Sequence, residues 1–473
     1  MVLRSLMLSA ALIGAGSVAA AELRPDQKAF HDLYKELVET NTAGSSGSCT
    51  LASERMAARL KAAGYADSDI TLFSTPDHPK EGGIVAILKG SDPAAKPILL
   101  LAHIDVVAAK REDWVRDPFV LTEENGNYYG RGTLDDKTQA SIWTDSLIRL
   151  KKEGAKPKRT LKMALTCGEE GGGDGFNGAR WLTENRRDLI DAAFALNEGG
   201  GGLLDAQGKP SAIVIEAGEK AYRDYRLEVT NPGGHSSRPV KDNAIYHLAH
   251  ALIAVESHPF PVQFTDASRA YFTAIAKQQA AKGNKAVADA LLDMQKTPND
   301  GKAAEIVAAA DPSWNGTMRT TCVATMLEGG HAPNALPQRA RANVNCRIFP
   351  GVSGEEVRKA LAAAINDPQV SVTMVTPDEK AAAIPPLQPE VMGPAEKLMN
   401  EMWPGVPVLP ILQVGATDGR YTNNAGIPTY GIDATFIDTE LNHIHGLNEY
   451  VNIDALMKNR DFLYRLVKLY IGA

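Results

Sequence analysis

Hydrophobic positions in the first 200 residues fall into short apolar runs separated by helical patterns. Continuous apolar runs of this length are typical of strands that are covered on both faces. They occur at Ile84 to Leu88, Ile98 to Ala102, Leu161 to Thr166 and Ala192 to Leu196. Helical patterns occur at residues 26–39, 50–63, 137–152 and 177–187. This alternation predicts an α/β sheet with helices on both faces.

The pattern changes near Gly218 and changes back near residue 383. Residues 222–230 alternate like a half-exposed strand. Helices are expected at 243–257, 270–310 and 355–365, and strands at 320–326, 341–349 and 370–375. We therefore predict an α/β/α catalytic domain with a mixed sheet, in two segments at 22–217 and 383–473. An inserted α+β domain is expected at 218–382.

The first 21 residues have the features of a secretory signal peptide. Arg4 precedes a short apolar stretch from Leu6 to Val18, and Ala19 to Ala21 offer small residues for cleavage. The stretch is shorter than the roughly 20 apolar residues that span a bilayer. We expect a signal peptide at 1–21, export to the periplasm or the medium, and no membrane span after its removal.

Charge and cysteine content narrow the class of protein. Lys and Arg total 50 against 57 Asp and Glu, a formal charge of −7, which argues against a nucleic-acid partner. The four cysteines include no CxxC pair, which excludes a zinc ribbon. Cys322 and Cys346 lie in two strands that could pair. A disulfide between them and two unpaired core thiols both remain open.

Residues able to bind a metal follow the predicted strands of the first segment. His103 and Asp105 come after the run that ends at Ala102, and residues two apart on an extended chain face the same way. Asp105 can therefore accept a hydrogen bond from the His103 ring and fix its tautomer. Glu198 ends another strand. The carboxyl ends of strands are where open α/β sheets place their sites.

Paired carboxylates extend this set. Asp135 and Asp136 lie on a glycine-flanked turn before a helix, a placement that suits a carboxylate bridging two cations. Glu169 and Glu170 end a strand, so one can bind a metal while the other faces substrate as a base. With His443 or His445 near the C-terminus, the set predicts two sites that share a carboxylate. Two divalent cations are expected, zinc first, with cobalt or manganese as alternatives.

Five motifs in combination resemble the M20 metallopeptidases, which include aminoacylases, glutamate carboxypeptidases and carnosinase-like dipeptidases. The motifs are HIDVV, YYGRGTLDDK, TCGEEGGG, NEGGG and HGLNEY, and the resemblance covers essentially the whole chain after the signal. It implies hydrolysis of the amide bond of a small dipeptide or N-acyl amino acid with a free carboxylate. It also implies attack by a metal-bound hydroxide.

The resemblance also implies a role for each residue of the site. Asp135 would bridge the two metals, and the peptide bond after it would be cis. His103 and Glu198 would bind one cation, with Asp105 supporting His103. Glu170 and His445 would bind the other cation. Glu169 would be the general base.

The same resemblance implies that the insert at 218–382 is a lid and dimerisation domain, and it adds further candidate residues. His235, in GGHSSRP, matches a lid histidine that reaches the active site of a partner subunit and stabilises the oxyanion, which implies a homodimer. Asn334 and Arg347 match positions that contact the substrate carboxylate. Arg420 is a further candidate, because a carboxylate suits a planar guanidinium group.

Three other classes of protein compete with this interpretation. Gly173 to Gly178 matches GxGxxG, but Glu169, Glu170 and Asp174 would repel the pyrophosphate of a dinucleotide. A non-catalytic M20-fold binding protein is the second alternative, and the presence of Glu169 argues against it. A serine hydrolase is disfavoured because the chain has no GxSxG.

Of the two neighbouring histidines, His445 rather than His443 opens the family's motif.

Overall fold

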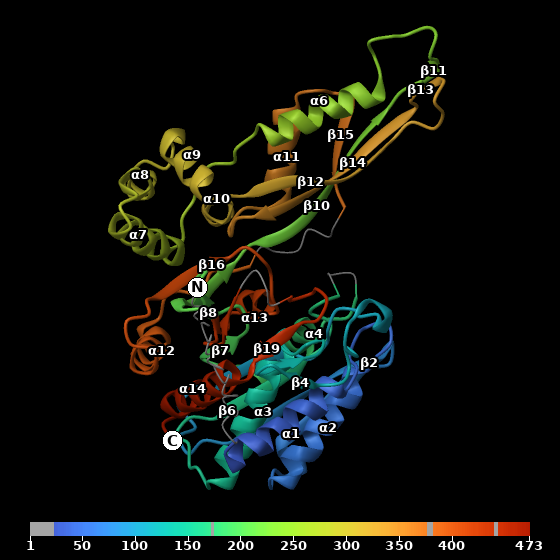
Figure 1. The fold of residues 1–473 in the computed structure, drawn as a ribbon. Helices are drawn as coiled ribbons and strands as arrows, with labels where there is room; N and C mark the ends of the chain where they lie inside the picture. Colours follow the sequence, from blue (N-terminus) through green and yellow to red (C-terminus); the bar gives the residue numbers. More distant parts are fainter. Residues whose placement is uncertain (1–22, 172–174, 376–381, 439–442) are drawn as a thin grey trace, which may run out of the picture.

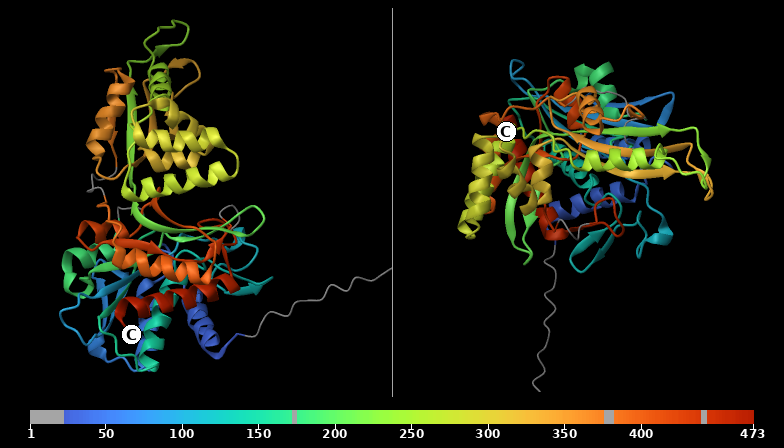
Figure 2. Two further views of the ribbon diagram at one scale, coloured as in Figure 1. Left: turned by 90° about the vertical axis from the view of Figure 1, so that its left-hand side faces the viewer. Right: turned by 90° about the horizontal axis from the view of Figure 1, so that it is seen from above.

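The computed structural model describes residues 23–171, 175–375, 382–438 and 443–473. The predicted signal peptide at 1–21 lies outside these residues. A mixed sheet flanked by helices forms the lower body in Figure 1, and a smaller α+β unit stands above it. Figure 2 shows the same arrangement from the side and from above. We call the lower body the catalytic domain and the insert at 218–382 the lid.

The catalytic domain is built on a ten-stranded mixed sheet with the order β1-β2-β6-β3-β7-β17-β9-β8-β18, and β16 also pairs with β9. Its strands are β1 Ile70–Thr75, β2 His78–Leu88, β3 Ile98–His103, β6 Leu161–Thr166, β7 Phe194–Asn197, β8 Gly201–Leu204, β9 Pro210–Glu219, β16 Val408–Gln413, β17 Thr429–Ile432 and β18 Phe436–Ile437. A small sheet pairs β4 Thr122–Glu124, β5 Asn127–Tyr129 and β19 Tyr450–Asn452. The α/β fold with a mixed sheet is therefore as predicted.

Helices cover both faces of the large sheet, which explains the continuous apolar runs. In β3, Ile98 and Leu100 pack into one core cluster, and Leu99 and Leu101 pack into another on the opposite face. One face carries α1 Pro25–Glu39, α2 Cys49–Ala62, α3 Lys137–Lys152, α12 Pro389–Met402 and α14 Ile453–Ile471. The other face carries α4 Gly178–Asn185 and α5 Arg187–Ile190, and α13 Gly419–Asn424 packs against α4. Two short 3-10 helices span Asp67–Asp69 and Arg111–Asp113.

The lid contains an antiparallel four-stranded sheet with the order β12-β14-β10-β15. Its strands are β10 Ala221–Thr230, β12 Thr321–Gly329, β14 Arg339–Ile348 and β15 Val370–Met374, and one face packs against α6 Ala244–Glu256 and α11 Gly354–Ile365. A separate pair, β11 Gly234–His235 and β13 Ala335–Leu336, lies at the end of the lid farthest from the catalytic domain (Figure 1). Tyr225, Leu227 and Val229 are buried, as the alternation predicts.

Four helices of the insert pack on the catalytic sheet rather than on the lid sheet. They are α7 Asp266–Ala281, α8 Lys285–Lys296, α9 Gly301–Ala310 and α10 Pro312–Met318. Phe272, Leu291 and Met294 share a core cluster with Val214 of β9 and Leu409 of β16. These helices therefore fix the insert against strands β9 and β16 of the catalytic sheet.

All four cysteines form disulfides. Cys322 and Cys346 lie directly opposite one another on β12 and β14 and are bonded, so the open question about this pair is resolved in favour of a disulfide. The second bond joins Cys49 of α2 to Cys167, which follows β6. The sequence analysis did not foresee this bond, because 118 residues separate the two cysteines. None of the helices in the described part of the chain is long and apolar enough to cross a membrane.

Candidate active site

The predicted metal-binding residues converge at one edge of the catalytic sheet. Strands β3, β6 and β7 run parallel, so their carboxyl ends meet at the same edge. His103 is the last residue of β3, Glu169 and Glu170 lie just beyond β6, and Glu198 follows β7. Neighbouring parallel strands therefore bring His103 close to Glu169 and Glu198, which are 66 and 95 positions away in sequence.

Two groups of side chains share the carboxylate of Asp135. In the first, Oδ1 of Asp135 lies 3.0 Å from Nε2 of His103, which is 3.6 Å from Oε1 of Glu198. In the second, Oδ2 of Asp135 lies 3.0 Å from Nε2 of His445, which is 2.9 Å from Oε2 of Glu170. Within each group the ligand atoms lie within 4.8 Å of one another, so each group could hold a metal ion.

The chemistry of these donors fits a pair of divalent cations. Imidazole nitrogens and carboxylate oxygens are zinc ligands, and cobalt and manganese accept similar sets. The Asp135–Asp136 peptide bond is cis, as the resemblance implied. Hydrogen bonds that His445 donates to the carboxylates of Asp135 and Glu170 raise the pKa of His445 to about 10. The pKa of His103 also lies above its ordinary value, because nearby carboxylates, first that of Glu198, outweigh the opposing effect of burial. This excess of negative charge favours cations at the site.

Asp105 orders two parts of the site at once. The Nδ1 atom of His103 lies 3.0 Å from the backbone oxygen of Asp105 and 3.6 Å from its carboxylate. The carboxylate itself accepts hydrogen bonds from the backbone N–H groups of Glu169 at 3.3 Å and Glu170 at 3.0 Å. Asp105 therefore supports His103 mainly through its backbone, and its side chain fixes the turn that carries Glu169 and Glu170.

Glu169 lies beside the two ligand groups and belongs to neither. Its pKa is raised well above the ordinary value, first by burial and then by the negative charge of Glu198. Cations held by the two ligand groups would offset this repulsion. The position leaves its carboxylate available for proton transfer.

Glu449 positions the turn that carries Asp135, a role that the sequence analysis did not assign. Its buried carboxylate accepts hydrogen bonds from Arg131 Nη1 at 2.7 Å and from the backbone N–H groups of Gly132, Leu134 and Asp135 at 3.0, 2.8 and 3.1 Å. The signal was present in the sequence, because Glu449 is the glutamate of the HGLNEY motif that begins with His445.

Replacing Glu449 with alanine should lower the free energy of unfolding by about 3–5 kcal/mol, because it leaves Arg131 buried without its carboxylate. Denaturant titration of the metal-free protein measures the change. The control is Glu390→Ala, which removes an exposed ion pair with Arg159 and should cost less than about 1 kcal/mol. A loss no larger than that of the control would contradict this role.

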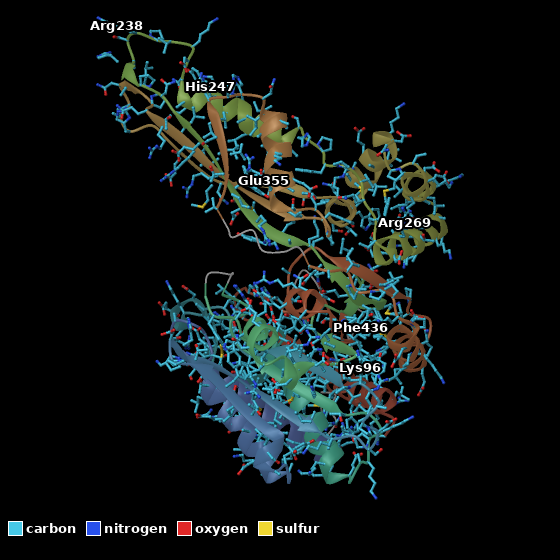
Figure 3. All side chains as sticks on the ribbon, turned by 180° about the vertical axis from the view of Figure 1, so that it is seen from behind. Lys96, Arg238, His247, Arg269, Glu355 and Phe436 are labelled. Atoms are coloured by element: carbon cyan, nitrogen blue, oxygen red, sulfur yellow. A yellow bond between two sulfur atoms is a disulfide. The ribbon has the colours of Figure 1, made fainter. Side chains whose placement is uncertain are left out.

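The candidate residues of the lid lie at its two opposite ends. His235 is exposed at the far end of the lid, where the backbone N–H of Ser236 donates to the backbone oxygen of Asn334 at 3.1 Å. Figure 3 labels the neighbouring Arg238 at this end, away from the catalytic domain. Within one chain, His235 and Asn334 therefore do not join the two ligand groups.

The two arginine candidates lie elsewhere. Arg347, near the end of β14, stacks over the Tyr222 ring at 4.9 Å, at the end of the lid sheet that adjoins the catalytic domain. Arg420 is the second residue of α13 and lines a hollow of about 370 Å³ with residues of α4. Neither arginine is a member of the ligand groups.

Two further sequence features are the choice between His443 and His445 and the GxGxxG match. His445 rather than His443 contacts Asp135, and the His443 ring packs 6.3 Å from that of Tyr450. Gly173 and Asp174 of the GxGxxG match lie outside the described residues.

Two ligand groups on the carboxyl edge of an α/β sheet, beneath an inserted lid, define a metal-dependent hydrolase. The chain belongs to peptidase family M20/M25/M40, whose family model matches residues 99–469. This membership leaves the dinucleotide-dependent and serine-hydrolase alternatives without support.

Individual relatives agree with this assignment. The human N-fatty-acyl-amino acid synthase/hydrolase PM20D1 is 30% identical over 390 residues, which cover 80% of this chain and 75% of that protein. Probable carboxypeptidase S-like 2 of Dictyostelium discoideum is 28% identical over 80% of this chain and 73% of its own length. The fold resembles that of an M20 family metallo-carboxypeptidase from Sulfolobus solfataricus, with a TM-score of 0.70, 19% identity, and coverage of 95% of this chain and 100% of that one.

Proposed function

We propose that the protein is an exported two-metal amidohydrolase that releases an amino acid from a small N-acyl amino acid or dipeptide with a free carboxylate. One observation carries the proposal: Asp135 presents its two carboxylate oxygens to two different histidines, in two adjoining ligand groups. A carboxylate in this position can bridge two cations. An aspartate with a purely structural role would not need to contact a histidine in each of the two ligand groups.

The residues of the chain divide the work between metal binding and proton transfer. His103, Glu198 and Asp135 would hold one cation, and Asp135, Glu170 and His445 the other. When bound, the cations supply Lewis acidity that polarises the amide carbonyl and makes water a better nucleophile. Glu169 takes a proton from the attacking water and returns it to the leaving amine. The carboxylate of Asp105 keeps Glu169 in place by accepting a hydrogen bond from the backbone N–H of Glu169.

The lid completes the site in a homodimer. His235 would reach the site of the partner subunit and donate a hydrogen bond to the oxyanion, and Asn334 lies beside it. Arg347 and Arg420 are proposed to receive the substrate carboxylate, because guanidinium groups bind carboxylates through two parallel hydrogen bonds.

An exposed apolar surface of the lid supports the homodimer. Strand β12 is at one edge of the lid sheet, and its Val323, Met326 and Leu327 are 60, 64 and 66% exposed. Tyr246 and Ile253 of the adjacent α6 are also exposed. An unpaired edge strand with apolar side chains is a surface that pairs with another chain.

The acyl side of the substrate has a candidate pocket beside the ligand groups. A cavity of about 250 Å³ is lined by Asp135, Glu198 and Gly199 to Gly201, together with the apolar side chains of Leu134, Ile437 and Ile444. The rest of its lining is polar and consists of Asp136, Thr138, Gln139, Gln413, Asp433 and Thr435. Its apolar part suits an acyl chain, and the name of the human relative refers to N-fatty-acyl amino acids. We therefore place N-acyl amino acids ahead of free dipeptides.

Export is supported by the signal-like residues 1–21 and by the two disulfides. Disulfides form and persist in oxidising compartments such as the periplasm and the extracellular space. The periplasm or the medium is therefore the proposed location.

Amine release by the mature, zinc-supplemented protein tests this function. The panel pairs N-acetyl and longer N-acyl amino acids with free dipeptides built on the same amino acids. We expect cleavage that a chelator abolishes and added zinc restores, since both ligand groups lose their cations. Cleavage that persists in chelator would contradict the two-metal mechanism. If protein that retains two metals per chain released amine from neither set of substrates, the result would favour the alternative of a non-catalytic binding protein.

A further inference from the structure

The Cys49–Cys167 disulfide lies directly beneath the turn that carries the proposed base. Cys167 is the residue between the end of β6 and the sequence Gly168-Glu169-Glu170. Its partner Cys49 is the first residue of α2. Both cysteines are buried, with 1 and 3% of their surface exposed. The bond therefore ties the catalytic turn to a helix on the face of the sheet that carries α1 and α3.

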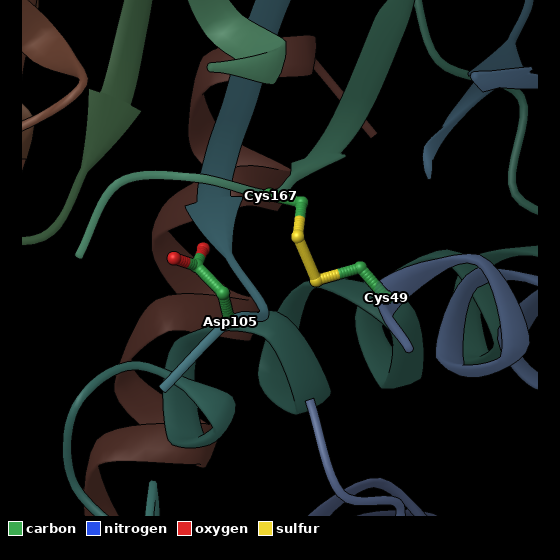
Figure 4. A group of neighbouring side chains, drawn as sticks. All are labelled: Cys49, Asp105 and Cys167. Atoms are coloured by element: carbon green, nitrogen blue, oxygen red, sulfur yellow. A yellow bond between two sulfur atoms is a disulfide. The ribbon is translucent and has the colours of Figure 1, made fainter. Parts of the chain in front are cut away.

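The carboxylate of Asp105 lies beside the same disulfide. A carboxylate oxygen of Asp105 and the two sulfur atoms are all within 4.8 Å of one another, and Figure 4 shows the three side chains together. A disulfide sulfur is not a thiolate, so this cluster is not a third metal site in the oxidised protein. Its geometry instead places a covalent bond and a hydrogen-bond acceptor next to each other under one turn.

The turn is held by several independent contacts. The Asp105 carboxylate accepts the backbone N–H groups of Glu169 and Glu170. The backbone oxygen of Cys167 accepts the N–H of Gly178 at 2.7 Å. The disulfide is the covalent member of this set, and it acts on the residue two positions before Glu169.

The second disulfide of the protein has no comparable position. Cys322 and Cys346 are opposite residues on β12 and β14, which the strand pairing already holds side by side. This bond lies in the lid sheet, and neither cysteine adjoins a residue of the two ligand groups. It therefore serves as a matched control.

We propose that the Cys49–Cys167 disulfide is a positioning element for catalysis, which holds Glu169 and Glu170 at the reacting groups. The enzyme is fully active only while this bond is oxidised. The inference rests on the proposed function, since it assigns the disulfide a role through the base and a metal ligand. Without the bond the turn keeps only its hydrogen bonds, and a displacement of about 1 Å at a catalytic group can cost ~10²-fold in rate.

A phosphine reduces the Cys49–Cys167 bond when its phosphorus atom attacks one sulfur and the S–S bond breaks. Water then supplies the oxygen of the phosphine oxide and the protons of the two thiols. The disulfide gains two electrons and two protons, and the phosphine loses two electrons. A phosphine is preferred because dithiols bind zinc through their thiolates.

The test uses the full mature protein with Cys322→Ala and Cys346→Ala, in which Cys49 and Cys167 are the only cysteines. This variant is titrated with a phosphine, and free thiols, kcat, KM, metal per chain and far-UV circular dichroism are measured at each step. The Cys49→Ala/Cys167→Ala double variant, with the lid disulfide intact, gives a second measurement without reductant.

As two thiols appear, we expect kcat to fall about 10- to 100-fold with KM nearly unchanged. Two metals per chain and the circular dichroism should be retained, and reoxidation should restore kcat. The oxidised Cys322→Ala/Cys346→Ala variant should match the native protein. An unchanged kcat when both thiols are free would overturn the inference and leave the proposed function intact. Loss of secondary structure together with activity would also overturn it, because the bond would then be merely structural. An oxidised variant that cleaves nothing on the panel, although folded and metal-loaded, would overturn the proposed function and this inference with it.

Discussion

Replacing Glu169 with glutamine should lower kcat roughly 10²- to 10⁴-fold, the usual contribution of a general base. Glutamine keeps the shape of the side chain but cannot take a proton from the attacking water. Glu169 belongs to neither ligand group, so the variant should retain two metals per chain. Turnover of the best substrate of the panel and metal content by mass spectrometry are the measurements.

Glu401→Gln is the matched control for this variant. Glu401 is an exposed glutamate on α12 that pairs with Arg465 of α14. Its replacement should leave kcat within a factor of about two, because exposed ion pairs contribute little. If Glu169→Gln were as active as this control, another group would have to act as the base.

His235→Ala should lower kcat roughly 10²- to 10³-fold, the cost of removing one donor to the oxyanion. The metal content should not change, since His235 lies at the far end of the lid from the ligand groups. Because the proposed action is across the dimer, the decisive measurement combines two inactive chains.

Co-expression of His235→Ala and Glu169→Gln chains should restore activity. In a mixed dimer, the site with an intact Glu169 receives His235 from the other chain, and the second site lacks both groups. Random pairing in a two-fold dimer makes half of the dimers mixed, so about one-quarter of the native activity should return. Each variant expressed alone serves as the control. If His235 acted within its own chain, the mixed dimers would recover nothing.

Periodic burial and local motifs were readable from the sequence. The runs at Ile98 to Ala102 and Leu161 to Thr166 became β3 and β6 because both faces of the sheet are covered. The predicted ligands His103, Asp135 and Glu198 come together because they follow structural elements that meet at one edge. Such positions lie at the carboxyl ends of parallel strands, where open α/β sheets place their sites.

The strand β9 shows where this reasoning failed. It spans Pro210–Glu219 between β17 and β8 in the catalytic sheet, yet no strand was predicted there. Its apolar residues Ala212 to Ile215 are followed by Glu216 and Glu219, both buried. Burial raises the pKa of Glu219 to about 8. A single chain gives no reason to expect two carboxyl groups inside a sheet, because burial of a charge costs free energy that only tertiary contacts can offset.

The sequence by itself determined the α/β class, the residues able to bind two metals, and the resemblance that named their roles. The tertiary structure decided which groups these residues contact. It joined Cys49 to Cys167, directed the Asp105 carboxylate to the backbone of Glu169, and placed Glu449 under the turn of Asp135. These partners are 118, 64 and 314 positions apart. Hydrophobic periodicity reports which face of an element is buried, but the partner of a polar group depends on how distant segments pack.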